Sequence, residues 1–174
     1  MVQVAEEKPP AGETGVKWTL LTSESIDTAE DILQVVDWHR ARWTIEEFFK
    51  ALKTGCAFET RQLESLHSLT NALAKFLQIA WRLLLLKTLA RDEHSLPAST
   101  VMTSDELRVL QGLAARRYKF PPEPTARDVY LALAAVGGHI KYNGEPGWIT
   151  LSRGLDDLLM ALRGYQIAKN SDEM

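Results

Sequence analysis

The chain has 174 residues, of which 45% are hydrophobic and 25% charged, the composition of an ordinary globular protein with one domain or two small ones. Its formal net charge of −3 excludes a global basic field, so any contact with nucleic acid must come from a local patch. Cys56 is the single cysteine, which excludes an internal disulfide and a cysteine-rich zinc site and indicates a reducing, cytoplasmic setting.

The N-terminal segment is predicted to contain a leader, a strand and a helix. Residues 1–15 are rich in Glu, Pro and Gly, which indicates a mobile leader, and their polarity excludes a signal peptide. Alternating side chains over 16–22 predict a short strand. A helix over about 28–42 should follow, capped by Ser25 or Asp27.

A second helix is expected directly after the first, over 44–54. Thr44 and Glu47 have the spacing of a capping box, and Gly55 is the expected stop. The mixed segment 57–63 is expected to be short and extended.

The long helix predicted over 66–91 is apolar nearly all round and should be central to the core. Its most apolar part, 76–90, is interrupted by Gln78, Arg82 and Lys87. This stretch is too short and too charged for a membrane span, so a buried core helix is predicted and no membrane partner is expected.

Three further helices are predicted in the C-terminal part. One begins at Ser104 and runs to about residue 115, and a second is capped by Thr125 and ends before Gly137 and Gly138. The last runs over about 148–168, and its apolar stripe fits either a core or an interface. The stripe comprises Leu151, Leu155, Leu158, Leu162 and Tyr165. The basic cluster 116–119 is interpreted as a solvated helix end.

The most informative pattern is His39, Arg42, Glu46 and Lys53. Steps of three, four and seven residues return side chains to one side of a helix at about 100° per residue. A carboxylate among cations and an imidazole suits a divalent metal beside a phosphate. The alternative is a solvated helix face with i,i+4 ion pairs.

A second stripe lies beside this pattern and is expected to pack inward. It comprises Trp38, Ala41, Ile45, Phe48, Phe49 and Leu52. The tryptophans at 38, 43, 81 and 148 are accordingly predicted to be core residues. His39 and Arg42 share a face with Glu46 only if the break between the two helices is shallow.

The chain resembles the C-terminal part of the bacterial cut-and-paste transposases of the insertion-sequence-four family. These enzymes carry a tyrosine-arginine-glutamate-lysine signature with gaps of two, three and six residues, which are the gaps from His39 through Arg42 and Glu46 to Lys53. Local words agree, including Ile45-Glu46-Glu47-Phe48 and the segments 17–24 and 103–107. His39 stands in place of the signature tyrosine.

The resemblance implies a role for each of these residues. Glu46 would be the third metal-binding carboxylate of a two-metal nuclease that uses Mg²⁺ or Mn²⁺, and the two aspartates of that set would lie upstream of Met1. Arg42 and Lys53 would hold a DNA phosphate, and His39 would donate to one. Trp18 would stack on a base flipped out of the duplex. Two more cations, Lys50 and Arg61, are candidates for backbone phosphates.

Each role has a plainer alternative: Trp18 as an inward-facing strand residue, Glu46 as a helix-surface glutamate, and His39 as a surface histidine that touches nothing. The expected fold is mainly α. A short N-terminal strand precedes a helical bundle, and the resemblance implies a remnant of a ribonuclease-H-like core over 16–103 and a helical dimerisation subdomain over 104–174.

Two functions from different classes stay open. The first is the C-terminal part of a bacterial, cytoplasmic DNA transposase that binds double-stranded transposon ends, forms a dimer and is inactive alone. The second is a non-catalytic helical protein that dimerises with a full-length transposase and inhibits it.

Overall fold

The computed structural model describes residues 1–60, 62–92 and 96–172. It is mostly helical with one small sheet, in agreement with the predicted fold class. The chain forms two compact units, Met1–Glu47 and Phe48–Met174, which we describe separately.

The first unit is built on a two-stranded antiparallel sheet. Strand β1 (Val2–Ala5) pairs with β2 (Lys17–Leu20), and Val2 lies opposite Leu20. Helix α1 (Ala29–Ala41) contributes Val35 and Val36 to the core that these strands form. The strand predicted over 16–22 is confirmed by β2.

Strand β1 corrects one prediction, because residues 2–5 were assigned to an irregular leader. Val2 is 4% exposed and packs in the small core, and the Glu6 N–H donates to the Val16 carbonyl oxygen at 2.9 Å. The proline- and glycine-rich residues therefore form the connection between two strands. Four residues with two valines give too weak an alternation to predict a strand.

Helix α1 begins close to the predicted residue, but its cap differs from the predicted one. Thr28 is the N-cap, since its side chain accepts from the Asp31 N–H while the Asp31 carboxylate accepts from the Thr28 N–H. The prediction of Ser25 or Asp27 as the cap was wrong. Ser25 instead donates its hydroxyl to the Asp27 carboxylate, which makes a local turn before the helix.

The break after α1 is shallow. Arg42 interrupts the helical pattern by one residue but keeps helical angles, with φ −54° and ψ −32°, and α2 (Trp43–Lys50) follows at once. The continuation was predicted as regular helix to residue 54, yet Ala51–Gly55 is a π-helical turn. Phe58–Thr60 then forms a 3₁₀ turn, so the extended segment predicted at 57–63 was wrong at these residues.

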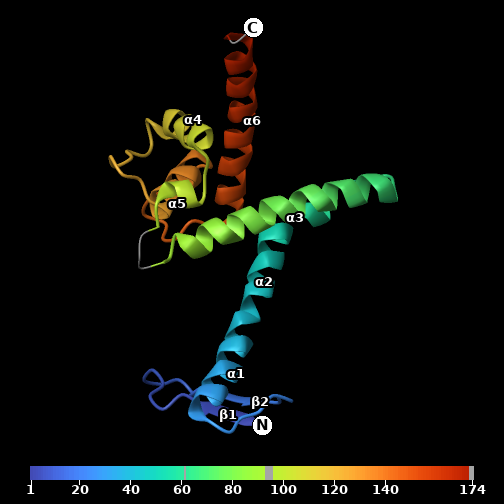
Figure 1. The fold of residues 1–174 in the computed structure, drawn as a ribbon, viewed down its shortest axis with the longest axis vertical. Helices are drawn as coiled ribbons and strands as arrows, with labels where there is room; N and C mark the ends of the chain where they lie inside the picture. Colours follow the sequence, from blue (N-terminus) through green and yellow to red (C-terminus); the bar gives the residue numbers. More distant parts are fainter. Residues whose placement is uncertain (61, 93–95, 173–174) are drawn as a thin grey trace. The chain divides into compact units, whose positions relative to one another are not determined.

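The second unit is a packed set of helices. Helix α3 (Leu66–Leu89), α4 (Ser104–Ala114) and α5 (Ala126–Val136) pack with α6 (Trp148–Asp172) around one core. Figure 1 shows α4 and α5 beside α6, with the C-terminal end of α3 passing the start of α6. A 3₁₀ turn, Ala98–Thr100, joins this core before α4.

Helix α5, and not α3, is the most buried element of this unit. Val129, Tyr130 and Leu133 are at most 1% exposed. In α3 burial begins at Ala80, and Leu66 near its start is 79% exposed. The prediction that α3 is central therefore holds only for its C-terminal part, from Ala80 on.

Close approach of α5 to α6 depends on two glycines. A Cβ at Gly154 would lie 2.0 Å from the Leu133 carbonyl oxygen, and one at Gly137 would lie 1.8 Å from the Thr150 carbonyl oxygen. No side chain fits at those distances, so both positions require glycine for packing. Gly138, with φ +91°, ends α5 as the sequence predicted.

The stripe of α6 divides between core and surface. Leu151, Leu155 and Leu158 are at most 1% exposed and belong to the core, whereas Leu162 and Tyr165 are half-buried. The predicted domain boundary at 103/104 falls inside this core and is not a division between compact units. The functional division that it stood for stays a prediction.

Among the described residues, one helix, α3, has the length and composition to cross a membrane. Core helices of soluble proteins meet the same criteria. Leu83, Leu84 and Leu86 of α3 pack against the other helices of the second unit, which favours the core interpretation.

Candidate functional site

The first unit brings Trp18 and His39 into direct contact. Trp18 lies on β2 and His39 on the last turn of α1, and their ring centroids are 5.0 Å apart with an interplanar angle of 58°. Both side chains are half-buried, and Trp18 also packs against the core of Val2, Leu20, Val35 and Val36. The alternative of a histidine without contacts is therefore wrong.

This contact leaves Trp18 partly available. The Trp18 side chain is half-buried and packs on the small core, so part of its surface is accessible to another group. The position therefore agrees with the inward-facing alternative for the part of the side chain that is buried.

Arg42 and Glu46 form an ion pair on the same helical surface. The Arg42 Nη1 lies 3.5 Å from the Glu46 Oε1, and both side chains are more than half exposed. Arg42 keeps helical angles, so the condition of a shallow break is met and the four-residue step brings the two side chains together. Exposed pairs of this type contribute about 0–1 kcal/mol, so this one can separate at little cost.

The remaining predicted cations belong to the second unit or lie outside the described residues. Lys53 lies on the π-helical turn, and its Nζ is 3.0 Å from the Glu59 Oε1. Lys50 is the last residue of α2. Arg61 lies outside the described residues. The face that Glu46 and Lys53 were predicted to share stays a prediction, because it assumed a regular α-helical period over the whole segment.

The Lys53–Glu59 pair was not predicted from the sequence. Glu59 is six positions after Lys53, which matches no helical step, and the 3₁₀ turn at Phe58–Thr60 returns Glu59 toward the π-helical turn. Three of the tryptophans predicted as core are largely exposed: Trp38 at 53%, Trp43 at 59% and Trp81 at 60%. Trp148, at 5%, confirms the prediction at its position.

The stripe expected to pack inward is divided. Leu52 is 5% exposed and Phe48 packs partly against the second core, but Ile45 is 56% and Phe49 48% exposed. The helical period correctly placed these side chains on one stripe. Burial also needs a neighbouring element over that stripe, which the period does not specify.

A divalent metal would find a suitable oxygen donor in Glu46. Mg²⁺ takes carboxylate oxygens, and the exposed carboxylate is accessible once it leaves Arg42. The described residues contain no group of three His, Cys, Asp or Glu side chains placed to hold a metal ion. Within them, Glu46 fits the part of one ligand in a larger set.

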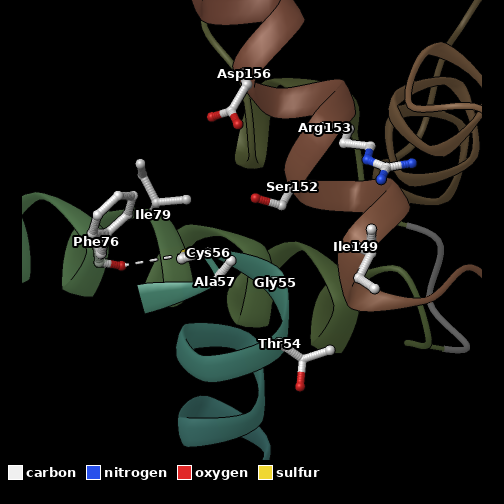
Figure 2. Close-up of a pocket in the computed structure, with 10 residues that line it drawn as sticks. All are labelled: Thr54, Gly55, Cys56, Ala57, Phe76, Ile79, Ile149, Ser152, Arg153 and Asp156. Carbon is white, nitrogen blue, oxygen red and sulfur yellow. Dashed lines mark hydrogen bonds between the residues drawn. The ribbon is translucent and has the colours of Figure 1, made fainter. Parts of the chain in front are cut away.

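The second unit contains a pocket of about 330 Å³, and its lining includes Thr54, the residue after Lys53. It lies between residues 54–57, the middle of α3 and the start of α6. Figure 2 shows the Ser152 side chain directed into this space, with Asp156 and Arg153 farther along α6. Cys56 donates its thiol to the Phe76 carbonyl oxygen at 3.8 Å. No predicted site residue lines this pocket among those described.

The family model of the transposase DDE domain matches residues 4–81, a little under half of the chain. The matched segment contains all seven predicted site residues, from Trp18 to Arg61. Proteins of this family act on DNA and generally use divalent metal ions. The match supports a DDE transposase, and with it a transposase-related function for this chain.

Proposed function

We propose that this chain is the C-terminal part of a DNA transposase of the insertion-sequence-four family. In the complete enzyme Glu46 supplies the third metal-binding carboxylate, and Arg42 and Lys53 hold a phosphate of the transposon end. The observation that carries the proposal is the family match over 4–81, because it spans every residue of the signature. Bacterial cytoplasm is the proposed location, as is typical for this family.

The Arg42–Glu46 pair supports a division of labour between these two residues. Without DNA each side chain neutralises the other at 3.5 Å on an exposed surface. In the proposed complex Glu46 turns to the metal and Arg42 turns to a phosphate, which its planar fork can grip through two oxygens. Mg²⁺ or Mn²⁺, when bound, polarises the phosphoryl oxygen and activates the attacking hydroxyl.

Trp18 and His39 are proposed to act at the DNA end as a pair. The half-buried indole offers a stacking surface for an unpaired base, and the imidazole beside it can donate a hydrogen bond to a phosphate. Lys50 and Arg61 are proposed as further contacts with the backbone of double-stranded DNA.

The test uses the complete enzyme that contains this segment. Replacing a residue that only hydrogen-bonds to a metal ligand typically reduces activity roughly 10–100-fold. Glu46→Gln removes a proposed ligand itself, so it should reduce strand transfer by more than that. It should leave binding to transposon ends intact. Glu24→Gln is the matched control, since Glu24 is exposed in the same unit. Loss of end binding as complete as the loss of strand transfer would contradict this division of roles.

Arg42→Ala and Lys53→Ala should show the opposite pattern. Each should weaken end binding and lower the slope of log affinity against log salt by about 1, as expected for one phosphate contact. The 174-residue chain alone should not nick end DNA in Mg²⁺, because we propose that it supplies one carboxylate of three. Nicking by the chain that Glu46→Gln abolishes would disprove this point.

A second candidate, a helical module that dimerises with another copy or with a full-length transposase, rests on the end of α6. Beyond Leu158 the helix exposes Met160 at 76% and Ile167 at 61%, which are apolar side chains suited to an interface. Light scattering on the whole chain and transposition under co-expression test this candidate. A monomer at high concentration with undiminished transposition would rule it out.

A further inference from the structure

A groove in the second unit lies entirely outside the matched segment. It has a volume of about 510 Å³ and is formed by the residues after α4, one side of α5 and the loop that leads to α6. The groove residues that matter here are Arg117, Lys119, Arg127, His139, Lys141 and Glu145. We call this site the C-terminal basic groove.

Positive charge gathers in the groove against the balance of the chain. Four cationic side chains and one carboxylate line it, whereas the whole chain has a formal net charge of −3. Arg91, at the end of α3, lies near enough to act electrostatically on Glu145 and Tyr130. A local cationic surface on an acidic protein favours a polyanionic partner.

Two of the arginines are held by the protein itself. The Arg117 Nη1 donates to the carbonyl oxygens of Ala135 and Val136 at 3.2 and 3.0 Å, where the negative end of the α5 dipole also attracts a cation. Arg127 donates through both terminal nitrogens to the two carboxylate oxygens of Glu145. Glu145 thus occupies the position where a phosphate would offer the same pair of oxygens.

The two lysines are exposed. Lys119 and Lys141 have no hydrogen bond or ion pair with the described residues. They are therefore available for an outside anion.

The segment that carries Lys119 is anchored on both sides. The Tyr118 hydroxyl donates to the Asp128 Oδ1 at 2.7 Å, and the Tyr118 ring lies edge-on to Phe120 with centroids 5.2 Å apart. Burial, with the neighbouring Asp128 carboxylate, raises the pKa of Tyr118 well above its usual range, so the hydroxyl stays a donor. An anchored backbone reduces the entropy lost when Lys119 binds a ligand.

We propose that the C-terminal basic groove binds backbone phosphates of double-stranded DNA as a second, sequence-independent contact. Lys119 and Lys141 act as point charges, and Arg127 exchanges Glu145 for a phosphate. Tyr130, which Arg127 covers with 5.3 Å from its Cζ to the ring centroid, is 1% exposed and offers no face for a base. Tyr130 therefore does not contribute base stacking to the proposed contact. This inference rests on the proposed function for its choice of DNA as the polyanion.

The experiment measures binding of the 174-residue chain to a random-sequence duplex of about 20 base pairs across a salt series. Lys119→Gln with Lys141→Gln should lower the slope of log affinity against log salt by about 1.8, at about 0.9 for each lost phosphate contact. Lys75→Gln with Arg163→Gln is the matched control, since it removes two exposed cations from the same unit and should leave the slope unchanged.

Glu145→Gln provides a test in the opposite direction. Because it removes the carboxylate that competes with phosphate for Arg127, it should raise the affinity for the duplex, and the slope should stay unchanged since Arg127 contacts a phosphate in both chains. Lys119→Arg with Lys141→Arg should keep the original slope. This would show that the slope depends on the two positive charges and that both positions tolerate substitution.

Several outcomes would overturn the inference. These are no binding of the random duplex, an unchanged slope in the double lysine variant, and an equal loss in the control. Stronger binding of a polyglutamate peptide than of the duplex would assign the groove to a protein ligand. The change of slope on replacing Lys119 and Lys141 does not depend on Glu46, Arg42 or Lys53, because those residues are present in both chains that are compared. Unchanged end binding in the Arg42→Ala variant, together with the expected change of slope in the groove variant, would disprove the proposed site alone.

Discussion

The two units differ in how much of their sequence goes into a core. The first buries Val2, Leu20, Val35 and Val36 against a two-stranded sheet. The second buries a continuous set of side chains from Ala51 to Leu158 across several helices. A two-stranded sheet is marginally stable by itself, whereas packed helices with a shared core support themselves. The first unit, which contains His39, Arg42 and Glu46, is therefore the less stable of the two by itself.

The ion pairs of the two units differ in the same way. Arg42–Glu46 in the first unit is more than half exposed on both sides, and its partners can exchange for a metal and a phosphate. In the second unit the Arg82 Nη2 of α3 lies 2.8 Å from the Glu106 Oε1 of α4, and the Glu106 side chain is 11% exposed. The exposed pair suits a site that must change partners, and the buried pair suits a fixed joint.

The largest effect on stability is expected at the contact of α5 with α6. Gly154→Ala would place a Cβ 2.0 Å from the Leu133 carbonyl oxygen, so the helices must separate at a cost of about 3 kcal/mol or more. Gly164→Ala on the same helix meets nothing within 4 Å and should raise stability by up to about 1 kcal/mol. Chemical denaturation measures both. Equal effects would show that α5 and α6 do not meet as described.

An intermediate effect is expected at Glu106, which caps α4 and pairs with Arg82. Burial alone would raise the pKa of Glu106, but the Thr103 N–H and the Arg82 guanidinium hold it below its usual range. The stabilisation is therefore present above the unfolded pKa and is lost as the pH falls through the lower folded pKa.

Glu106→Gln should cost about 1–3 kcal/mol at pH 7 and reduce the loss of stability on acidification. Urea denaturation between pH 3 and pH 7 checks both points. Asp37→Asn is the control, because Asp37 pairs with Arg40 at 3.6 Å on an exposed surface. If the stability of Glu106→Gln depended on pH as that of the unchanged chain does, Glu106 would not be the cause of the loss of stability at low pH.

The smallest effect is expected in the first unit. Trp18→Ala removes the ring contact with His39 and should destabilise that unit by about 1 kcal/mol, leaving the second unit unchanged. Hydrogen exchange resolves this, because amides of α1 should exchange faster while those of α5 do not. In the complete enzyme the same change should impair end processing more than initial binding. Slower exchange of the α1 amides, or faster exchange in both units, would show that the contact of Trp18 with His39 does not stabilise the first unit by itself.

Local signals in the sequence were sufficient for most helices and for part of the site. Thr125 as a cap and the end of α5 at Gly137 each depend on residues within one or two turns. The step from Arg42 to Glu46 is equally local, and the ion pair confirms that the two side chains share a face, as the alternative of a solvated helix face also predicted. Helical spacing, turn residues and caps act over a few residues, so a single sequence contains them.

Tertiary structure alone decided which of these surfaces are covered. The period placed Trp38 and Ile45 on an apolar stripe, but no described element buries them, and Leu151, Leu155 and Leu158 became core because other helices of the second unit pack against α6. The need for glycine at 154 arises from a carbonyl on a different helix. The groove likewise joins residues from the end of α4 to the loop before α6. Burial, close approach and the gathering of charge depend on elements distant in sequence, and no local pattern specifies that pairing.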